Sequence, residues 1–225
     1  MNQDDIFRKS EGNKWFQRNR GALMKSERFD WPIKTLELFN DTSDIKKVLE
    51  LGCANGWRLA RLKEIFGSDV ELFGLDASEE AIYDGQTRYP FLKLQVGTLS
   101  QIPLDQEFDL VIVNFVFHWI SRETLTKTVS EIDRMVKDGG MLLIGDFLPD
   151  FPQKRHYHHL PEEQHVFTFK QDYAEIFKSF CTYKEITKIA FNSDKLIDSV
   201  EIISSDKRGY CSLLHKSLYD YYLTK

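Results

Sequence analysis

Apolar segments of strand length recur along the chain, and the first of them is the most informative. It begins at Val48 and lacks regular alternation, which is typical of a central strand whose sheet is covered on both faces. Gly52 and Gly56 then predict a tight turn, because glycine allows positive φ and lets a ligand approach the backbone. Residues 58–66 follow with apolar side chains at helical spacing. Strand, glycine turn and helix together predict the nucleotide-binding corner of a doubly wound α/β sheet.

Strand and helix patterns continue to alternate through the rest of the chain. Further strands are expected over residues 70–76, 91–96, 108–114, 141–146, 183–191 and 209–216. Helices are expected over residues 33–39, after a cap at Ser78, over 121–137 with Ser121 as cap and residues 138–140 as stop, and over 171–180; residues 192–208 are expected to form a long hairpin connection. This order predicts an α/β fold, a Rossmann-like, doubly wound, seven-stranded sheet that is mostly parallel with an antiparallel C-terminal strand.

The spacing around the glycine turn separates two cofactor classes. A dinucleotide fingerprint would read G-x-G-x-x-G/A, but Ala54 stands at the second glycine position and Trp57 at the third. The remaining pattern, E-x-G-x-x-x-G from Glu50 to Gly56, resembles motif I of the class I S-adenosylmethionine (SAM)-dependent methyltransferases. In that family the turn faces the methionine part of the cofactor. The competing interpretation is an ordinary strand–turn–helix connection with two glycines.

Three further motifs of that family follow in the expected order. Asp76 ends the strand at residues 70–76, where a carboxylate can accept both hydroxyls of a ribose; the alternative is a simple helix cap. After Gly97 the family often has an acid that bonds the adenine amino group, but this chain has Thr98, a weaker acceptor. The pattern F-D-L-V-I at residues 108–112 is typical of the fourth strand of the family.

The N-terminal arm carries Trp15 and Arg18 in a pattern similar to the W-x-x-R-N arm of bacterial methyltransferases of sugars and other small metabolites. That resemblance implies that both residues cover the cofactor, with Arg18 pairing its carboxylate. The alternative is that Trp15 and Phe16 only fix the arm to the core. The whole resemblance spans residues 46–147 and implies SAM as cofactor and S-adenosylhomocysteine as product. The cofactor-binding residues that it implies are Trp15, Arg18, Gly52, Cys53, Ala54, Asn55, Gly56, Asp76, Ala77, Ser78, Thr98, Leu99, Asn114 and Phe115.

A single methyltransferase domain is expected over residues 1–225, because no internal repeat, low-complexity tract or linker interrupts the sequence. Its expected parts are an N-terminal helical arm (1–45), a SAM-binding core (46–147), an inserted lid (148–170) and a C-terminal helix with strands (171–225). An insertion after the fifth strand would lie above the carboxyl ends of the sheet, where it could cover the active site.

Histidines are the candidate catalytic residues, because imidazole can accept a proton near neutral pH. His118 precedes Trp119 in a segment that borders the substrate cavity in similar small-molecule methyltransferases, although a packed ring is the alternative. The expected lid adds further candidates, and Asp146 and Tyr157 stand behind them. The lid histidines could instead be plain loop residues, or bind a metal with neighbouring glutamates; their spacing matches no metal signature, so no metal site is predicted. The candidate bases are therefore His118, His156, His158 and His159.

The composition of the chain limits the classes of substrate and the cellular locations that are expected. The chain has 225 residues and a net charge of −5, with 30 Lys and Arg scattered among 35 Asp and Glu, so no nucleic-acid substrate is expected. Three widely spaced cysteines form no disulfide or zinc pattern, which favours reduced thiols and a cytoplasmic location. The sequence has no apolar run of membrane-spanning length, so no membrane anchor is expected. The oligomeric state, monomer or homodimer, stays open.

These patterns predict an enzyme that moves a methyl group from SAM to O, N or C of a small metabolite, a sugar being one candidate, by in-line displacement. Two alternatives remain: a SAM-binding but non-catalytic partner subunit, and a methyltransferase of a macromolecule such as tRNA or protein. The acceptor motif N/D-P-P-Y of amino-group methylases is absent after the fourth strand, where residues 114–117 read N-F-V-F.

Overall fold

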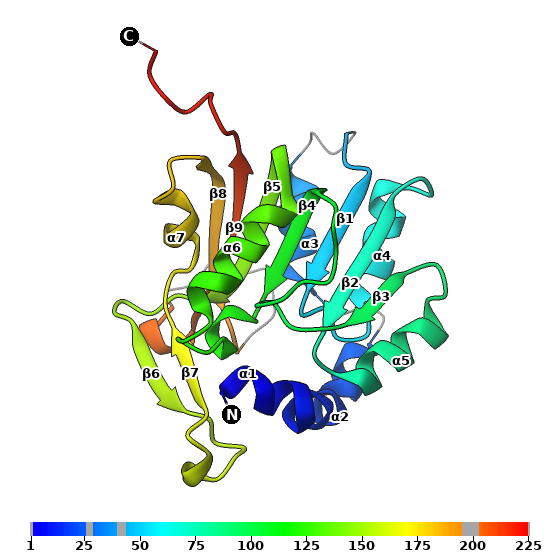
Figure 1. Cartoon of the computed structure of the whole chain (residues 1–225), viewed down its shortest axis with the longest axis vertical. Coiled ribbons are helices and arrows are strands. Elements are labelled where there is room, and N and C mark those ends of the chain that lie inside the picture. The colour runs from blue at the N-terminus through cyan, green and yellow to red at the C-terminus, as the bar shows by residue number, and fades with distance from the viewer. Residues whose placement is uncertain (1, 26–28, 40–43, 195–202, 225) are drawn as a thin grey trace.

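The structure is a computed structural model that describes residues 2–25, 29–39, 44–194 and 203–224. Seven strands form one sheet in the order β3-β2-β1-β4-β5-β9-β8, and β6 and β7 form a second sheet (Figure 1). The strands are β1 (Lys47–Leu51), β2 (Glu71–Asp76), β3 (Lys93–Val96), β4 (Phe108–Asn114), β5 (Val136–Phe147), β6 (Gln153–His156), β7 (Phe167–Lys170), β8 (Tyr183–Asn192) and β9 (Arg208–Lys216). The helices are α1 (Gln3–Ile6), α2 (Gly12–Leu23), α3 (Trp31–Leu38), α4 (Trp57–Phe66), α5 (Glu79–Arg88), α6 (Leu125–Met135) and α7 (Ala174–Lys178), with short turns η1 (Phe7–Glu11), η2 (Phe117–Trp119), η3 (Glu162–Gln164) and η4 (Ser205–Lys207).

The large sheet has the predicted topology. β1 pairs in parallel with β2 and β4, and these pair in parallel with β3 and β5 respectively. β9 pairs antiparallel with both β5 and β8, so it runs against the other strands. The strand order reverses between β1 and β4, and ligands of open α/β sheets bind outside the carboxyl ends of the strands at such a point. The seven-stranded Rossmann-like fold with one antiparallel strand is therefore confirmed.

Helices cover both faces of the sheet, which explains why its central strands are largely apolar. Leu49 and Leu51 of β1 belong to a core cluster with side chains of α6 and α7. Val48 belongs to a second cluster, with side chains of α3 and α4 on the opposite face (Figure 1). Successive side chains of a strand point to opposite faces. Glu50 follows on the α3 and α4 side and is the buried charged residue of β1, whereas Lys47 at the start of the strand is partly exposed.

The N-terminal arm, made of α1, η1 and α2, lies across the carboxyl ends of the strands (Figure 1). The amide of Gln3 donates to the backbone oxygens of Trp119 (2.5 Å) and Phe167 (2.7 Å). Helix α2 is held against α5 by an ion pair between Arg20 and Asp84 (2.7 Å). The arm therefore closes the end of the sheet where a ligand is expected.

Helix α6 begins later than the sequence predicted, and Ser121 does not cap it. The Ser121 N–H donates to Oδ1 of Asp4 (2.8 Å), and the Thr124 hydroxyl donates to Oδ2 of the same carboxylate. The helix itself begins at Leu125. A contact with the arm, remote in sequence, thus replaces the predicted local cap.

The end of α6 also differs from the prediction, because residues 138–140 do not stop a helix. β5 begins at Val136, which pairs with Phe108, whereas Met141 pairs with Leu110. The register shift means that the residues between them form a β-bulge, in which Gly139 takes a φ of 78°. Glycine with positive φ is common in such bulges.

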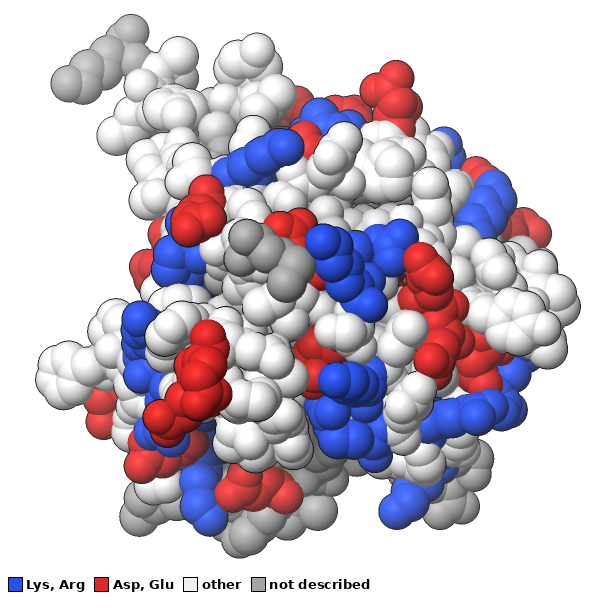
Figure 2. Space-filling view, turned by 60° about the horizontal axis from the view of Figure 1, so that its bottom comes forward, with Lys and Arg blue, Asp and Glu red and all other residues white. Residues whose placement is uncertain are grey.

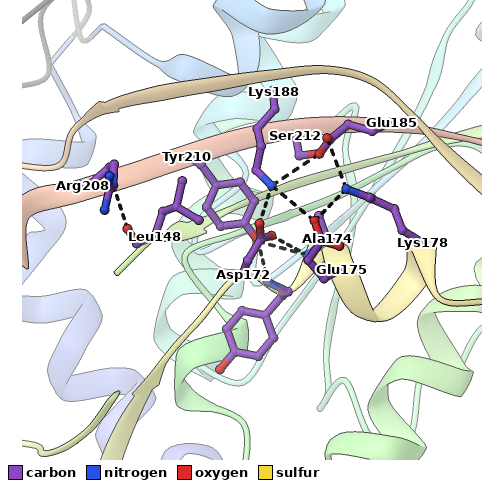
Figure 3. A network of polar contacts seen from close by, with 11 residues as sticks. Leu148, Asp172, Ala174, Glu175, Lys178, Glu185, Lys188, Arg208, Tyr210 and Ser212 are labelled. Atoms are coloured by element: carbon purple, nitrogen blue, oxygen red, sulfur yellow. Dashed lines mark hydrogen bonds and ion pairs between the residues drawn. The ribbon is translucent and has the colours of Figure 1, made fainter. Parts of the chain in front are cut away.

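Helix α7 is shorter than the predicted helix at residues 171–180. The backbone N–H groups of Tyr173 and Ala174 donate to the phenolic oxygen of Tyr210 on β9, at 2.8 and 3.2 Å (Figure 3). Lys188 on β8 forms an ion pair with Asp172 immediately before them. Polar contacts from β8 and β9 therefore determine where this helix starts.

The predicted lid is a hairpin of β6 and β7 beside the arm, with η3 between its strands (Figure 1). Tyr157 follows β6 and is buried against Trp119, with ring centroids 4.5 Å apart. Residues 195–202 of the predicted hairpin connection lie outside the described residues; η4 and β9 follow them. None of the helices in the described part of the chain is long and apolar enough to cross a membrane.

We predict that Gly52→Ala destabilises the fold by ~1–3 kcal/mol. Gly52 has a φ of 76°, and a Cβ there would overlap the Val116 side chain. Denaturant unfolding followed by circular dichroism measures the effect.

Gly21→Ala is the matched control. Gly21 is exposed in α2, and a Cβ there meets nothing within 4 Å, so this change should stabilise the protein by ~0.5–1 kcal/mol. Adding Val116→Ala to Gly52→Ala should recover part of the loss. Equal midpoints for Gly52→Ala and the wild type would contradict the prediction.

Candidate active site

The turn after β1 is unusually tight and is fixed to the neighbouring strand. Gly52, Ala54 and Gly56 all have positive φ, at 76°, 49° and 73°. The Gly52 N–H donates to the backbone oxygen of Leu75 at the end of β2 (2.7 Å). A left-handed backbone at a non-glycine residue costs on the order of 1–3 kcal/mol and is often found where a ligand is held. Ala54 is therefore a marker of a site as well as of a turn.

Asp76 ends β2 and joins the turns that follow β1 and β2. Its Oδ2 accepts from the N–H of Ala54 (2.7 Å), and its Oδ1 accepts from the N–H of Ser78 (2.8 Å). Each carboxylate oxygen can accept another hydrogen bond, so vicinal hydroxyls of a ribose could be held by one residue. Burial raises the pKa of Asp76 above its ordinary value, although the backbone donors act in the opposite direction.

A cavity of about 490 Å³ opens at the carboxyl ends of β1, β2, β4 and β5, beneath the arm. This volume lies within the roughly 300–1,000 Å³ that small-molecule sites occupy. Asn114 lies at the end of β4 in the cavity wall, and its Oδ1 is buried without a hydrogen-bond partner. A buried, unpaired amide oxygen is costly unless a ligand donates to it. The Asn114 oxygen is therefore free to accept a hydrogen bond from a ligand in the cavity.

A buried ion network lies under the glycine turn. Arg58 of α4 forms two bonds to Asp30, from Nε to Oδ1 and from Nη2 to Oδ2, both 3.0 Å long. Its Nη1 donates to Glu50 of β1. All three side chains are buried. Although Arg58 contributes to the cavity wall, its guanidinium is engaged by two carboxylates.

His118 lines the cavity and forms a buried pair with Asp146, which does not line it. His118 Nδ1 lies 2.9 Å from Asp146 Oδ1, and the His118 N–H donates to Oδ2 (3.2 Å). The N–H of Phe147 also donates to Oδ1 (2.8 Å). His118 follows β4 and Asp146 lies near the end of β5, which places both at the edge of the sheet where ligands bind. The pair can hold an imidazole in one orientation and accept a proton.

Aromatic rings surround this pair. The His118 ring centroid lies 4.5 Å from that of Trp119 and 5.0 Å from that of Phe147. Phe115 packs edge-on against Phe147 at 5.1 Å, and its φ of 54° is exceptional for an aromatic residue. All four rings line the cavity.

The structure brings most of the predicted cofactor residues together. Arg18 is an exception: its guanidinium bonds Glu11 and the Tyr157 hydroxyl, so the expected pairing with a ligand carboxylate has no support in the geometry. Asn55 donates to Asp84 and Ser78 caps α5, so both lie behind the wall, as does Gly56. The predicted residues that line the cavity are Trp15, Gly52, Cys53, Ala54, Asp76, Ala77, Thr98, Leu99, Asn114 and Phe115.

His118 is the one candidate base among the cavity-lining residues that the structure describes. His156, His158 and His159 lie at and after the end of β6 and do not line the cavity; the latter two are exposed. The reason is that the hairpin packs beside the arm instead of over the sheet. Within the described ranges, no group of His, Cys, Asp or Glu has the arrangement of a metal site.

Sequence reasoning missed several wall residues. Asp4 and Phe7 come from the start of the arm, which carries no motif. Phe147 ends β5 and Asp194 follows β8, both far along the chain. Phe147 could have been found, because it directly follows the predicted strand at 141–146. Arg58 could not, since a charged residue in a predicted helix is normally exposed.

Basic and acidic side chains are interspersed on the side of the molecule that carries the arm (Figure 2). A nucleic-acid footprint would gather Lys and Arg on one face. The charge pattern of this face therefore favours a small ligand over a polyanion.

Residues 48–140 match a protein family described as methyltransferase domain. Among curated proteins, the chain is 28% identical over 123 residues to malonyl-[acyl-carrier protein] O-methyltransferase 1 of Coxiella burnetii, covering 54% of this chain and 41% of that protein. It is 27% identical over 160 residues to a tRNA N(3)-methylcytidine methyltransferase of Schizosaccharomyces pombe, covering 64% and 48%. The chain thus spans less than half the length of these relatives.

Solved structures share the fold. A chain in the complex between the Haloferax volcanii Trm112 methyltransferase activator and a methyltransferase has a TM-score of 0.65 at 18% identity, covering 97% of this chain and 99% of that chain. N-methyltransferase NodS of Bradyrhizobium japonicum, in complex with S-adenosylhomocysteine, has a TM-score of 0.56 at 14% identity, covering 89% and 97%. At sequence identities this low, the likeness shows a shared fold and nothing more.

We predict that Glu50 makes the protein less stable as pH rises. Burial raises the pKa of Glu50 from 4.5 to about 7, against the opposing charge of Arg58. Between these values the folded state keeps a proton that the unfolded state has released, so the free energy of unfolding falls with rising pH. The advantage of wild type over Glu50→Gln should shrink by ~1–3 kcal/mol between about pH 5 and pH 8.

Unfolding curves of both proteins at several pH values measure this difference. Glu71→Gln is the control, because Glu71 is exposed and its Lys93 partner lowers its pKa, so it titrates below this window. Parallel pH profiles for wild type and Glu50→Gln would contradict the prediction.

Proposed function

We propose that the chain transfers a methyl group from SAM to a small-molecule acceptor, with S-adenosylhomocysteine as the product, and the match of residues 48–140 to a family described as methyltransferase domain supports this proposal. The observation that carries the proposal is the geometry of Asp76. Its carboxylate bonds the turns after β1 and β2 and still has lone pairs for two ribose hydroxyls.

The remaining wall residues suit the other parts of this cofactor. Thr98 and Leu99, after β3, border the cavity beyond Asp76. The resemblance to class I methyltransferases implies that the adenine ring of the cofactor lies beside these two residues. The unpaired Oδ1 of Asn114 can accept from the ammonium of the methionine part. Trp15, from the arm, lines the cavity and is the residue predicted to cover the cofactor.

Catalysis needs little covalent participation from the protein. The bound sulfonium supplies an activated methyl group with a neutral thioether as leaving group. The residues of the chain hold the acceptor in line and exclude water, and this positioning provides most of the acceleration. The arm contributes by closing the cavity over the ligands through the contacts of Gln3.

A small acceptor is favoured by the size of the cavity and by the mixed charges on the face around it (Figure 2). The three cysteines are free, with Cys53 and Cys211 buried, and reduced thiols are consistent with the cytoplasm as the site of action. The oligomeric state does not enter this proposal.

Two other functions have specific support. Methylation of tRNA is favoured by the likeness to the Schizosaccharomyces pombe enzyme, which extends over 64% of this chain. A non-catalytic subunit is favoured by the presence of a similar chain in a complex with the Trm112 activator. The net charge of −5 weighs against the first, and a cavity-lining histidine bonded to an aspartate weighs against the second.

We expect Asp76→Asn to weaken SAM binding by ~10- to 100-fold, because charge-assisted hydrogen bonds to the ribose are lost. Titration calorimetry of the full chain measures the affinity. Glu71→Gln removes a carboxylate from the other end of the same strand, away from the cavity, and should bind as wild type does. Absence of SAM binding by the wild type, or tighter binding of NADH, would refute the proposal.

We also expect no saturable binding of tRNA by the wild-type chain at physiological salt. Phosphate contacts give an affinity that falls steeply as salt rises. Fluorescence anisotropy with labelled bulk tRNA over a range of salt concentrations tests this. Saturable, steeply salt-dependent binding would make tRNA the preferred acceptor class.

A further inference from the structure

The cavity holds a second feature, beyond the cofactor-binding turns, that points to the chemistry of the acceptor. His118 lies in its wall among aromatic rings, and the buried Asp146 is 2.9 Å from its Nδ1. We propose that His118 is the general base for methylation of a phenolic hydroxyl, that Asp146 is its positioning residue, and that the acceptor is an uncharged aromatic molecule. This proposal rests on the proposed function, because it needs SAM as the methyl donor.

The tautomer of His118 follows from its hydrogen bonds. Both oxygens of Asp146 accept from backbone N–H groups, Oδ1 from Phe147 and Oδ2 from His118 itself. The carboxylate is thereby held as an acceptor, so His118 Nδ1 must be the donor at 2.9 Å. The lone pair is then on Nε2. This atom has no hydrogen-bond partner among the described residues, and it is not one of the atoms that are fully buried without a partner. Nε2 is therefore available to a ligand in the cavity.

The walls beside His118 select a flat, apolar ring. Phe115, Phe147 and Trp119 have ring centroids 6.2, 5.0 and 4.5 Å from the imidazole. Aromatic rings pack edge-to-face and offset-stacked at such separations. Phe115 holds its place with a φ of 54°, fixed by a bond from its N–H to the backbone oxygen of Gly145 (2.7 Å). A strained backbone that presents an aromatic side chain to a cavity is expected where a ligand is recognised.

The charges in the wall argue against an anionic acceptor. Arg58 is the sole Lys or Arg among the described lining residues, and Asp30 and Glu50 occupy its guanidinium. A carboxylate or phosphate on the acceptor would therefore share the cavity with the carboxylate of the cofactor, without a free cation to bind it, which is costly.

The carboxylates of the wall do not favour an ammonium acceptor either, because each already has a partner or is assigned to the cofactor. Asp4 accepts from Ser121 and Thr124, and Asp194 pairs with Lys207 at 3.1 Å. Asp76 is assigned to the cofactor. A neutral hydroxyl on a ring needs neither a free cation nor a free anion, and it needs a base because its proton must leave.

The proposed step balances as follows. An oxygen lone pair of the phenol forms the new O–C bond, while the C–S bond breaks with its electron pair left on sulfur. The phenolic proton passes to Nε2 of His118, so positive charge moves from the sulfonium to an imidazolium beside Asp146. The products are a methyl aryl ether and a neutral thioether, and the imidazolium releases its proton to water.

The test uses the full chain with SAM and three probes that carry the same ring: phenol, benzylamine, which is a cation at neutral pH, and benzoate. Pyridine, a neutral ring whose nitrogen has no proton to lose, serves as an acceptor that needs no base. We expect transfer to phenol and not to benzoate or benzylamine. His118→Gln should lower the rate with phenol by ~10²- to 10⁴-fold, but the rate with pyridine by less than ~10-fold.

Asp146→Asn should change the pH–rate profile with phenol more than that with pyridine, because Asp146 acts by orienting the imidazole. His215→Gln is the matched control: His215 lies on β9 outside the cavity wall, where its Nδ1 is 2.5 Å from the Tyr221 hydroxyl. It should retain the wild-type rates with both acceptors.

Two binding measurements separate this proposal from the proposed function. Calorimetry should show that His118→Gln binds SAM as tightly as the wild type; a wild type that binds no SAM overturns both proposals. Absorbance titration of 4-nitrophenol, at a pH where it is not ionised, into the protein loaded with S-adenosylhomocysteine reports acceptor binding without turnover.

If SAM binds but no phenol binds, or if benzylamine or benzoate is the preferred acceptor, the phenol assignment alone is overturned. Equal loss of rate with phenol and pyridine in His118→Gln would overturn the role as base.

Discussion

One buried guanidinium holds together the segments on which the cavity is built. Arg58 of α4 is bonded by Asp30, at the start of α3, and by Glu50 of β1, directly under the glycine turn. Charges taken out of water are tolerated only when the pairing geometry is good, and losing one partner leaves an uncompensated charge. The three segments must therefore keep their relative positions. The same pairing removes the cation of the cavity wall from ligand binding, which shapes what the cavity can accept.

Strain and unpaired polar groups concentrate in the same part of the molecule. Ala54 and Phe115 both have a left-handed backbone, and each follows a central strand at its carboxyl end. Asn114, the last residue of β4, keeps a buried amide oxygen without a partner. Each feature is unfavourable for folding alone. They coincide around one cavity, because a ligand bound there would relieve the unpaired oxygen and use the unusual backbone directions.

Patterns carried by neighbouring residues predicted the structure well, and patterns that depended on remote contacts did not. The glycine turn, Asp76 and the Ser78 cap are local, and they occur where expected. Ser121 looked like a helix cap, but its N–H bonds Asp4 of the arm. Gly139 looked like a helix stop, but strand pairing with β4 makes it part of a bulge. In both places a contact with a remote segment, and not the local preference of the residue, determined the structure.

The sequence by itself determined the order of strands and helices, the doubly wound sheet and the corner at which a cofactor would bind, because apolar periodicity and glycine turns act over a few residues. Only the tertiary structure decided which side chains meet. It joined His118 to Asp146 across the ends of β4 and β5, occupied Arg18 with Glu11, and left the histidines after β6 outside the cavity. Such pairings depend on how sheet, arm and hairpin pack against one another, and no spacing along the chain encodes that geometry directly.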